Sequence, residues 1–434
     1  MSQDGNNWKN NLRVSSRSDV GLRRANNQDS HAVALATTPQ QLVKRGHLMI
    51  VADGMGAHAA GELASKIAVD TIALSYAKRN NEDIAESLRS SVYDAHKQIR
   101  THSETDEAFH DMGTTADALV LSPAGAVVAH VGDSRVYRLR DRVLEQLTFD
   151  HSLVWEIRAS GKIPRDKIPG YIPKNVITRS LGPSENLKVD LEGPFPVRPG
   201  DHFLLCSDGL SGQVEDDEIG QILFVLTPDY ATETLVNLAN LRGGPDNITV
   251  ISAQVTAPLD AVRGQTGHIH AEKAISGMTF SLLAWTCLVF AILGLFLSGY
   301  SLIVNLQSSW PTVVSAVITL LFGGGFFFLA GRTAIADDRE KEEFSQHFFG
   351  KGPYVRVDAT PSPEFVGKLA TMMQQLRDAA QDEQWAINWT DIDHNEHEAV
   401  DAGNAEDFAK AIYHYSLAIN CMMRELKRQK RKKS

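Results

Sequence analysis

Acidic residues beside glycine, asparagine or serine recur through roughly the first 255 residues of this chain, usually at the end of an apolar run. They occur in five short blocks: Asn27-Gln28-Asp29, Asp53-Gly54-Met55-Gly56, Gly132-Asp133-Ser134-Arg135, Ser207-Asp208-Gly209-Leu210 and Asp246-Asn247-Ile248-Thr249. Carboxylate and carbonyl oxygens are the ligands that hard divalent cations prefer in proteins. A pair of such cations can activate water for the hydrolysis of phosphate esters. The blocks therefore predict a hydrolytic site with two metal ions.

Predicted strands position three of these carboxylates. Asp53 follows a strand over 47–52, Asp208 follows a strand over 201–206, and Asp246 comes just before a strand over 248–255. A single Asp-Gly pair is more often an ordinary turn. Three acidic turns at strand ends, each opening or closing an apolar run, favour a shared site instead.

The spacing of the other apolar runs predicts how the strands pair. Strand patterns at 114–121, 126–131, 135–139 and 143–147 are joined by connections too short for parallel crossovers, which implies antiparallel hairpins. Apolar residues recur at helical spacing over 61–76 and 82–99. Strands clustered in hairpins with helices grouped outside them predict an α+β fold, a four-layer α/β/β/α sandwich of two antiparallel sheets.

Composition narrows the class of protein. The chain has 434 residues and a formal net charge of −10, which argues against a nucleic-acid partner. Its three cysteines, Cys206, Cys287 and Cys421, are far apart in sequence and form no disulfide framework or zinc motif. The first residues, Met1–Trp8, are polar and predict no signal peptide.

A long uncharged stretch predicts a membrane anchor. No Asp, Glu, Lys, Arg or His lies between Lys273 and Arg332. This is enough for two transmembrane helices within 277–332, at about 278–302 and 312–331. Positive residues flank the pair but not the turn inside it, so both termini are expected on the cytoplasmic side of the inner or plasma membrane.

The parts around this hairpin are predicted to be a linker over 258–276 and a cytoplasmic helical region over 333–434. Glu364–Ala380 has an apolar face, and Gly403–Leu426 resembles one tetratricopeptide-like helix pair. An amphipathic helix packing on Glu364–Ala380 explains the second segment equally well. The basic tail, Lys427–Lys433, is either solvated or in contact with anionic membrane lipid or an acidic partner.

Over about residues 12–256, the ordered motifs resemble the bacterial type of the metal-dependent protein phosphatase 2C family, which predicts a catalytic domain over 1–257. The matching blocks are Arg24-x-x-Asn27-Gln28-Asp29, Asp53-Gly54-Met55-Gly56-x-His58-x-x-Gly61-Glu62, Gly113-Thr114-Thr115, Gly132-Asp133-Ser134-Arg135, Asp150-His151-Ser152, Thr178-Arg179-Ser180, Ser207-Asp208-Gly209-Leu210 and Asp246-Asn247-x-Thr249. The membrane hairpin and the C-terminal region lie outside this resemblance.

The resemblance implies a role for each acidic residue. Asp53 would bridge two catalytic ions, Mn²⁺ or Mg²⁺, and the Gly54 carbonyl would ligate one of them. Asp208 and Asp246 would ligate the other ion. Asp29 would act through metal-bound water. Asp133 would join Asp208 in a weaker third site.

The same resemblance implies how substrate is bound and attacked. Arg24 would bind the substrate phosphate, as suits a guanidinium fork. A metal-bridged hydroxide would then hydrolyse phosphoserine and phosphothreonine in proteins, which would reverse a bacterial Ser/Thr kinase at the membrane. Residues from about His151 to Arg179 would correspond to a flap beside the site.

One alternative belongs to another class, a phospho-dependent binding or scaffold protein at the membrane with weak or no catalysis. The presence of Asp53, Asp208 and Asp246 favours the enzyme, because family members that have lost activity usually lack such ligands.

Overall fold

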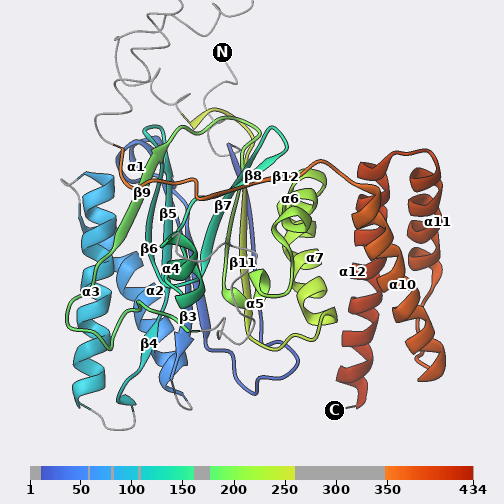
Figure 1. Cartoon of the computed structure of the whole chain (residues 1–434), viewed down its shortest axis with the longest axis horizontal. Coiled ribbons are helices and arrows are strands. Elements are labelled where there is room, and N and C mark those ends of the chain that lie inside the picture. Colours follow the sequence, from blue (N-terminus) through green and yellow to red (C-terminus); the bar gives the residue numbers. More distant parts are fainter. Residues whose placement is uncertain are drawn as a thin grey trace, which may run out of the picture. The chain divides into compact units, whose positions relative to one another are not determined.

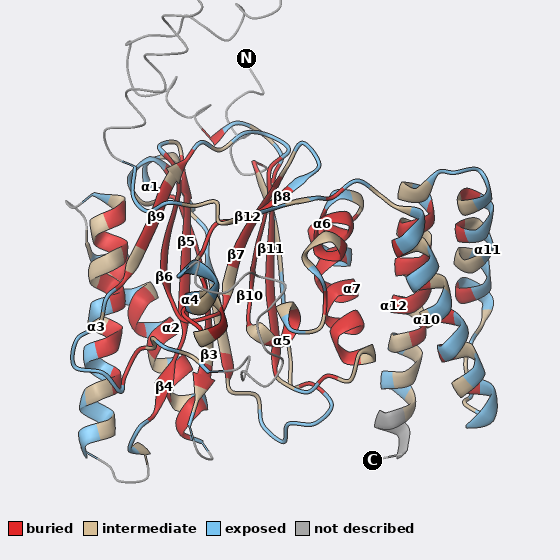
Figure 2. Ribbon diagram, in the orientation of Figure 1, coloured by how far each residue is buried: buried red, intermediate tan, exposed pale blue. Residues whose placement is uncertain are grey.

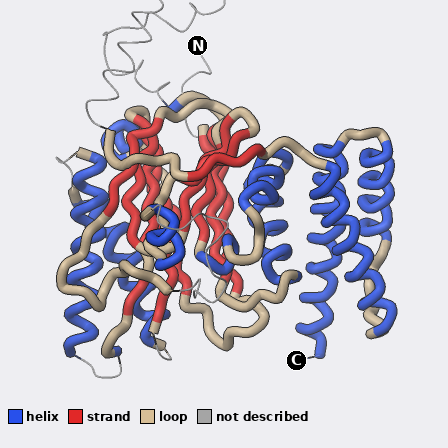
Figure 3. Tube along the Cα trace, in the orientation of Figure 1, coloured by secondary structure: helices blue, strands red, loops and turns tan. Residues whose placement is uncertain are grey.

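The computed structural model describes residues 11–56, 59–79, 83–105, 109–160, 176–259 and 348–433, whose strands form two antiparallel sheets (Figures 1 and 3). Sheet A has the order β1-β11-β10-β7-β8-β12, with β1 (Leu12–Asp19), β11 (Ile248–Val255), β10 (His202–Cys206), β7 (Arg135–Arg140), β8 (Val143–Gln146) and β12 (Val355–Asp358). Sheet B has the order β2-β3-β5-β6-β9, with β2 (Asp29–Ala34), β3 (His47–Met55), β5 (Ala116–Ser122), β6 (Gly125–Val131) and β9 (Asp190–Phe195), and β4 (Gly113–Thr114) pairs with β3. The predicted pair of antiparallel sheets is confirmed.

Helices cover the outer face of each sheet, which completes the predicted α/β/β/α layering (Figure 1). Sheet B is covered by α2 (Ala60–Lys78) and α3 (Ile84–Thr105), the two helices expected at 61–76 and 82–99. Sheet A is covered by α6 (Asp216–Val225) and α7 (Pro228–Leu241). The shorter helices are α1 (Pro39–Arg45), α4 (Leu153–Ala159) and α5 (Asp208–Ser211).

Successive side chains of β3 pack into two different hydrophobic cores, so the sequence of this strand is apolar without interruption. In β3, Met49 and Val51 join the cluster between the sheets, while Leu48 and Ile50 join the cluster under α2 and α3. Successive side chains of a strand point to opposite faces. The central strands are therefore buried on both sides (Figure 2).

The C-terminal region was expected to be helical, and this expectation is wrong for Val355–Asp358. These residues form β12, which pairs with β8 through Val357 and Leu144 and extends sheet A. Apolar and charged residues alternate in Val355-Arg356-Val357-Asp358, which suits an edge strand with one face buried. Three helices follow it: α10 (Pro363–Asp382), α11 (Thr390–Asn404) and α12 (Phe408–Lys433).

The C-terminal helices pack onto the helices of sheet A. Phe365 of α10 and Ile419 of α12 are buried in one cluster with Ile222 of α6 and Leu235 of α7. Gly403 lies in the last turn of α11, and α12 packs against both α10 and α11. The described residues up to 259 and from 349 onward accordingly belong to one compact unit.

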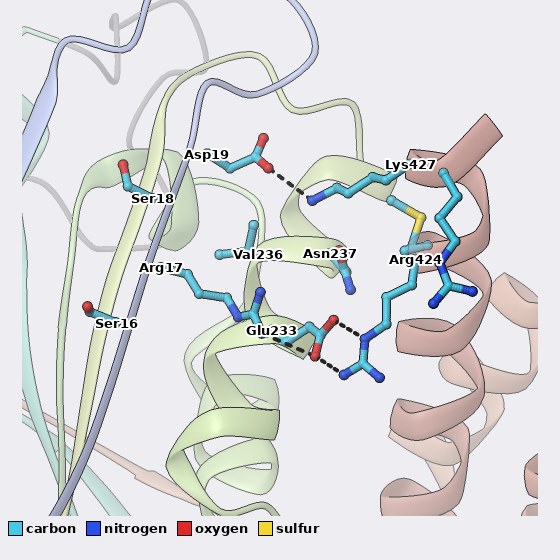
Figure 4. Close-up of a pocket in the computed structure, with 11 residues that line it drawn as sticks. Ser16, Arg17, Ser18, Asp19, Glu233, Val236, Asn237, Arg424 and Lys427 are labelled. Carbon is cyan, nitrogen blue, oxygen red and sulfur yellow. Dashed lines mark hydrogen bonds and ion pairs between the residues drawn. The ribbon is translucent and has the colours of Figure 1, made fainter. Parts of the chain in front are cut away.

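Polar contacts add to this apolar packing (Figure 4). Arg424 of α12 forms a forked ion pair with Glu233 of α7, in which Nε lies 2.7 Å from Oε1. Lys427 lies 3.2 Å from Asp19 at the end of β1. These side chains line a cleft of about 590 Å³ between β1, α7 and α12.

The expected membrane helices at about 278–302 and 312–331 lie outside the described residues, as does most of the expected linker over 258–276. Across the ranges that the structure describes, no helix combines the length and the apolar character that crossing a membrane requires.

Candidate metal-dependent active site

Sheet B brings two of the predicted acidic residues side by side. Asp29 begins β2, Asp53 lies near the end of β3, and they are directly opposite in the antiparallel register. Residues paired in this way project from the same face of a sheet. Two neighbouring threonines fix the Asp53 backbone. The Asp53 N–H donates to Thr115 Oγ1 at 2.9 Å, and the Asp53 carbonyl accepts from Thr114 Oγ1 at 2.9 Å.

Gly54 lies where two other segments meet the end of β3. Its N–H donates to the carbonyl of Gln28 at 3.1 Å. A Cβ atom at this position would lie 2.1 Å from the Gly61 carbonyl oxygen and 2.5 Å from that of Gln28. Only glycine allows this approach, so the backbone rather than a side chain is available to a ligand here.

Sheet A supplies the other two predicted metal ligands. Asp208 begins α5 and is separated by one residue from the end of β10, and Asp246 lies just before β11, the neighbouring strand. The carboxyl group of Asp208 is close enough to that of Asp53 for each to shift the pKa of the other. The fold thus joins acidic residues from both sheets that are far apart in sequence.

Burial and mutual repulsion disfavour the charged forms of these carboxyl groups. Burial raises the pKa of Asp29 to about 7, and the charges of Asp208 and Asp246 add to the shift while hydrogen bonds from Thr249 and Ser207 oppose it. Burial raises the pKa of Asp53 well above its usual range, with further contributions from Asp29 and Asp208. A nearby cation would relieve this repulsion.

Asp133, predicted to hold a third ion, follows β6 and is 7% exposed. Burial raises its pKa to about 7, and the charge of Asp208 contributes to the shift. Its neighbour Ser134 shares a hydrogen bond of 2.7 Å with Thr115, the residue that holds the Asp53 backbone. Asp133 is therefore part of the same electrostatic cluster.

Arg24 lies at the rim of this cluster. Its Nη2 atom is 2.7 Å from Asp246 Oδ2, and the Arg24 side chain is 47% exposed. The guanidinium group is therefore beside a predicted metal ligand and open to solvent, where an incoming phosphate could reach it.

The donor atoms fit hard divalent cations. Within the described ranges, one buried oxygen of Asp29, of Asp133 and of Asp208 has no hydrogen-bond partner. Among the same residues, no group of three or more His, Cys, Asp or Glu side chains is already gathered as a metal shell. The carboxyl groups form instead an open cluster of unsatisfied oxygens, and all-oxygen donors suit Mg²⁺ or Mn²⁺.

Two residues that support the site received no role in the sequence analysis. Asn247 Nδ2 donates to the carbonyls of Val20 at 2.9 Å and Asn26 at 3.0 Å, and its Oδ1 accepts from Gln28 N at 2.8 Å. Ser207 Oγ donates to Asp29 at 2.8 Å. Both lie inside the quoted motifs, and the available signal was a hydrogen-bonding side chain adjacent to a predicted metal ligand.

The ends of the expected flap, His151 to Arg179, meet at the start of β9, while residues 161–175 between them lie outside the described ranges. His151 Nε2 is 3.0 Å from Asp190 Oδ2, and Arg179 Nη1 is 2.8 Å from Asp190 Oδ1. Burial lowers the pKa of His151 to about 4. Asp190 therefore joins two segments that flank the undescribed stretch.

Sequence comparison agrees with this geometry. The family model for protein phosphatase 2C matches residues 22–242, about half of the chain. The chain is 37% identical over 240 residues to the serine/threonine phosphatase stp of Listeria monocytogenes. The matched region covers 54% of this chain and 92% of that protein. It is 36% identical over 245 residues to the protein phosphatase PhpP of Streptococcus pneumoniae. The matched region covers 55% of this chain and 96% of that protein.

Solved structures give the same result. The serine/threonine phosphatase of Mycobacterium tuberculosis matches with 34% identity and a TM-score of 0.50, over 56% of this chain and 99% of that one. The serine/threonine phosphatase of S. agalactiae matches with 32% identity and a TM-score of 0.51, over 56% of this chain and 99% of that one.

Proposed function

This chain belongs to the protein phosphatase 2C family and is a serine/threonine phosphatase, and from this premise we propose that it dephosphorylates proteins with the help of bound Mn²⁺ or Mg²⁺. One observation carries the metal dependence. Asp29 and Asp53 from sheet B converge with Asp208 and Asp246 from sheet A, and one buried oxygen each of Asp29 and Asp208 has no hydrogen-bond partner. Such a cluster is costly unless cations neutralise it.

We assign two catalytic cations to this cluster. Asp53, the Gly54 carbonyl, Asp208 and Asp246 would hold these ions. Asp29 would support them through water, and Asp133 together with Asp208 would hold a weaker third ion. When bound, the ions would lower the pKa of a water molecule and neutralise charge on the phosphate oxygens.

The chain's own residues orient the substrate and the ligands. Arg24, open to solvent beside Asp246, binds the phosphate through its guanidinium fork. Asn247 binds the backbone of Gln28, and the Gln28 carbonyl in turn accepts a hydrogen bond from the Gly54 N–H. These bonds fix the spacing between the segments that carry Asn247, Gln28 and Gly54. No phosphorylated enzyme intermediate is needed.

The cellular setting is also proposed. The uncharged stretch within 277–332 supports a two-helix anchor in the cell membrane, in contact with lipid and with both termini in the cytoplasm. A phosphatase held there would reverse the work of a Ser/Thr protein kinase. Resistance of the full chain to alkaline extraction from membranes is the expected result, and its release into the supernatant would contradict the anchor.

Hydrolysis of a phosphothreonine peptide by the full chain tests the enzyme. Phosphate release is expected with Mn²⁺ or Mg²⁺ and not with EDTA. Asp208→Asn is expected to reduce turnover by more than about 100-fold, since outer-sphere changes alone cost 10–100-fold. Asp229→Asn, an exposed Asp of α7, is the matched control.

Absence of turnover with either metal, in a chain that still unfolds cooperatively, would contradict catalysis. The alternative, phospho-dependent binding at the membrane, would then be measured directly as affinity for the same peptide.

A further inference from the structure

Residues 349–354, here called the strap, connect the two sheets. Phe349 is bridged to Gly193 in β9 of sheet B, and the Tyr354 N–H donates to the Gln146 carbonyl in β8 of sheet A at 2.8 Å. The strap lies beyond residues 22–242, the part matched by the family model.

The strap is built around one buried carboxylate. Glu192 of β9 is 2% exposed and accepts hydrogen bonds from Lys351 N at 3.1 Å, Gly352 N at 2.9 Å and Tyr354 Oη at 2.6 Å. Gly350 has φ +74°, and a Cβ atom there would lie 1.9 Å from Glu192 Oε2. Glycine is thus required for the strap to close around this carboxylate.

The ring of Tyr354 extends the contact toward α4. It meets Phe149 edge-on, with centroids 5.4 Å apart, and Phe149 meets Trp155 of α4 edge-on at 5.3 Å. The guanidinium of Arg135 lies 5.7 Å from the centroid of the Trp155 ring. Edge-to-face contacts of this kind favour one relative orientation of the rings.

The residues after Phe149 hold the turn that carries Asp133. Asp150 Oδ2 accepts from Arg135 Nε at 2.9 Å and from Nη2 at 2.8 Å. The His151 N–H donates to the Gly132 carbonyl at 2.7 Å, and the Gly132 N–H donates to His151 Nδ1 at 3.0 Å. Both flanks of Asp133 are therefore fixed by the segment against which Tyr354 packs.

We propose that Tyr354 is a positioning residue for the phosphatase reaction. By packing on Phe149 and binding Glu192, it fixes residues 149–155 and, through them, the turn that carries Asp133. A small displacement of such a turn can cost a large factor in rate. The kinetic part of this proposal rests on the proposed function, whereas the structural part does not.

The structural part is tested on the metal-free full chain by fluorescence of Trp155. Subtracting the spectrum of the same variant carrying Trp155→Phe isolates this residue among the six tryptophans. Tyr354→Ala and Gly350→Ala are expected to shift Trp155 emission to the red and to increase its quenching by acrylamide. Tyr230→Ala, which removes an exposed tyrosine of α7, should change neither signal.

The kinetic part uses p-nitrophenyl phosphate and a phosphothreonine peptide with saturating Mn²⁺. Tyr354→Ala is expected to lower kcat about tenfold on both substrates with little change in KM, at the lower end of the range for outer-sphere residues. Tyr354→Phe keeps the ring and loses only the hydrogen bond to Glu192, so it should recover most of kcat.

The following outcomes decide the proposal. Unchanged Trp155 emission and kcat in folded Tyr354→Ala and Gly350→Ala would overturn it, and so would a lower unfolding midpoint with unaltered kcat. If Tyr354→Ala does not fold, Gly350→Ala makes the same decision. If the unmodified chain has no turnover, the proposed function fails, and Trp155 emission still decides whether the strap holds α4.

Discussion

Among single residues, Arg24 allows substrate binding to be separated from stability. Its ion pair with Asp246 is 2.7 Å long, but the two side chains are 47% and 32% exposed. Such a pair contributes at most about 1 kcal/mol to folding. Arg24→Ala should therefore leave the unfolding midpoint nearly unchanged. It should raise KM for a phosphopeptide by about 10- to 100-fold, since hydrogen bonds to charged groups contribute roughly 1.5–3 kcal/mol.

The exposed neighbour Arg23 provides the control, because Arg23→Ala removes the same charge one residue away. Steady-state kinetics and thermal unfolding distinguish the roles. A fall in kcat at unchanged KM would show that Arg24 acts on Asp246 and not on the substrate phosphate.

Among the elements, α6, α7 and α10 are joined by Glu218. This α6 carboxylate is 1% exposed and forms ion pairs with Arg242 after α7 and, at 3.2 Å, with Lys368 of α10. Burial alone would raise the pKa of Glu218, but the hydrogen bond and charge of Arg242 outweigh it, and the pKa is lowered from 4.5. Because protons bind more weakly in the folded state, the stabilisation is present above this value and is lost as the pH falls below it.

Urea unfolding at pH 7, 5 and 4 tests this linkage. The unmodified chain should lose more stability between pH 5 and pH 4 than Glu218→Gln, which cannot titrate. Glu364→Gln, at a position 81% exposed that pairs with the same lysine, should behave like the unmodified chain. Equal pH dependence in all three proteins would refute a linkage through Glu218.

For the whole molecule, the C-terminal helices behave as a layer of the fold. Residues 1–257 alone would expose the apolar surface of α6 and α7 that Phe365, Leu369 and Ile419 cover. This fragment is expected to unfold at a lower temperature than the full chain. In the full chain, Ile419→Ala should cost about 2–5 kcal/mol as a buried truncation. Equal unfolding temperatures for fragment and full chain would show that the layer contributes no stability.

The strands that the sequence analysis missed share one position in the fold. β1, β2, β9 and β12 are the four strands at the edges of sheets A and B. Edge strands pair on one side only and are often polar, as in Leu12–Asp19, or contain proline, as in Asp190–Phe195. They therefore lack the apolar run that identified the central strands.

The acidic residues, the antiparallel hairpins and the two helices on sheet B were predictable from the sequence, because each depends on a local pattern of residue types. The meeting of Asp53 with Asp208, the bonds of Asn247 to a distant loop, and the closing of the strap around Glu192 were not. These contacts join residues separated by up to about 220 positions. Only the pairing and packing of both sheets bring these residues together, and no local pattern in the sequence predicts such contacts.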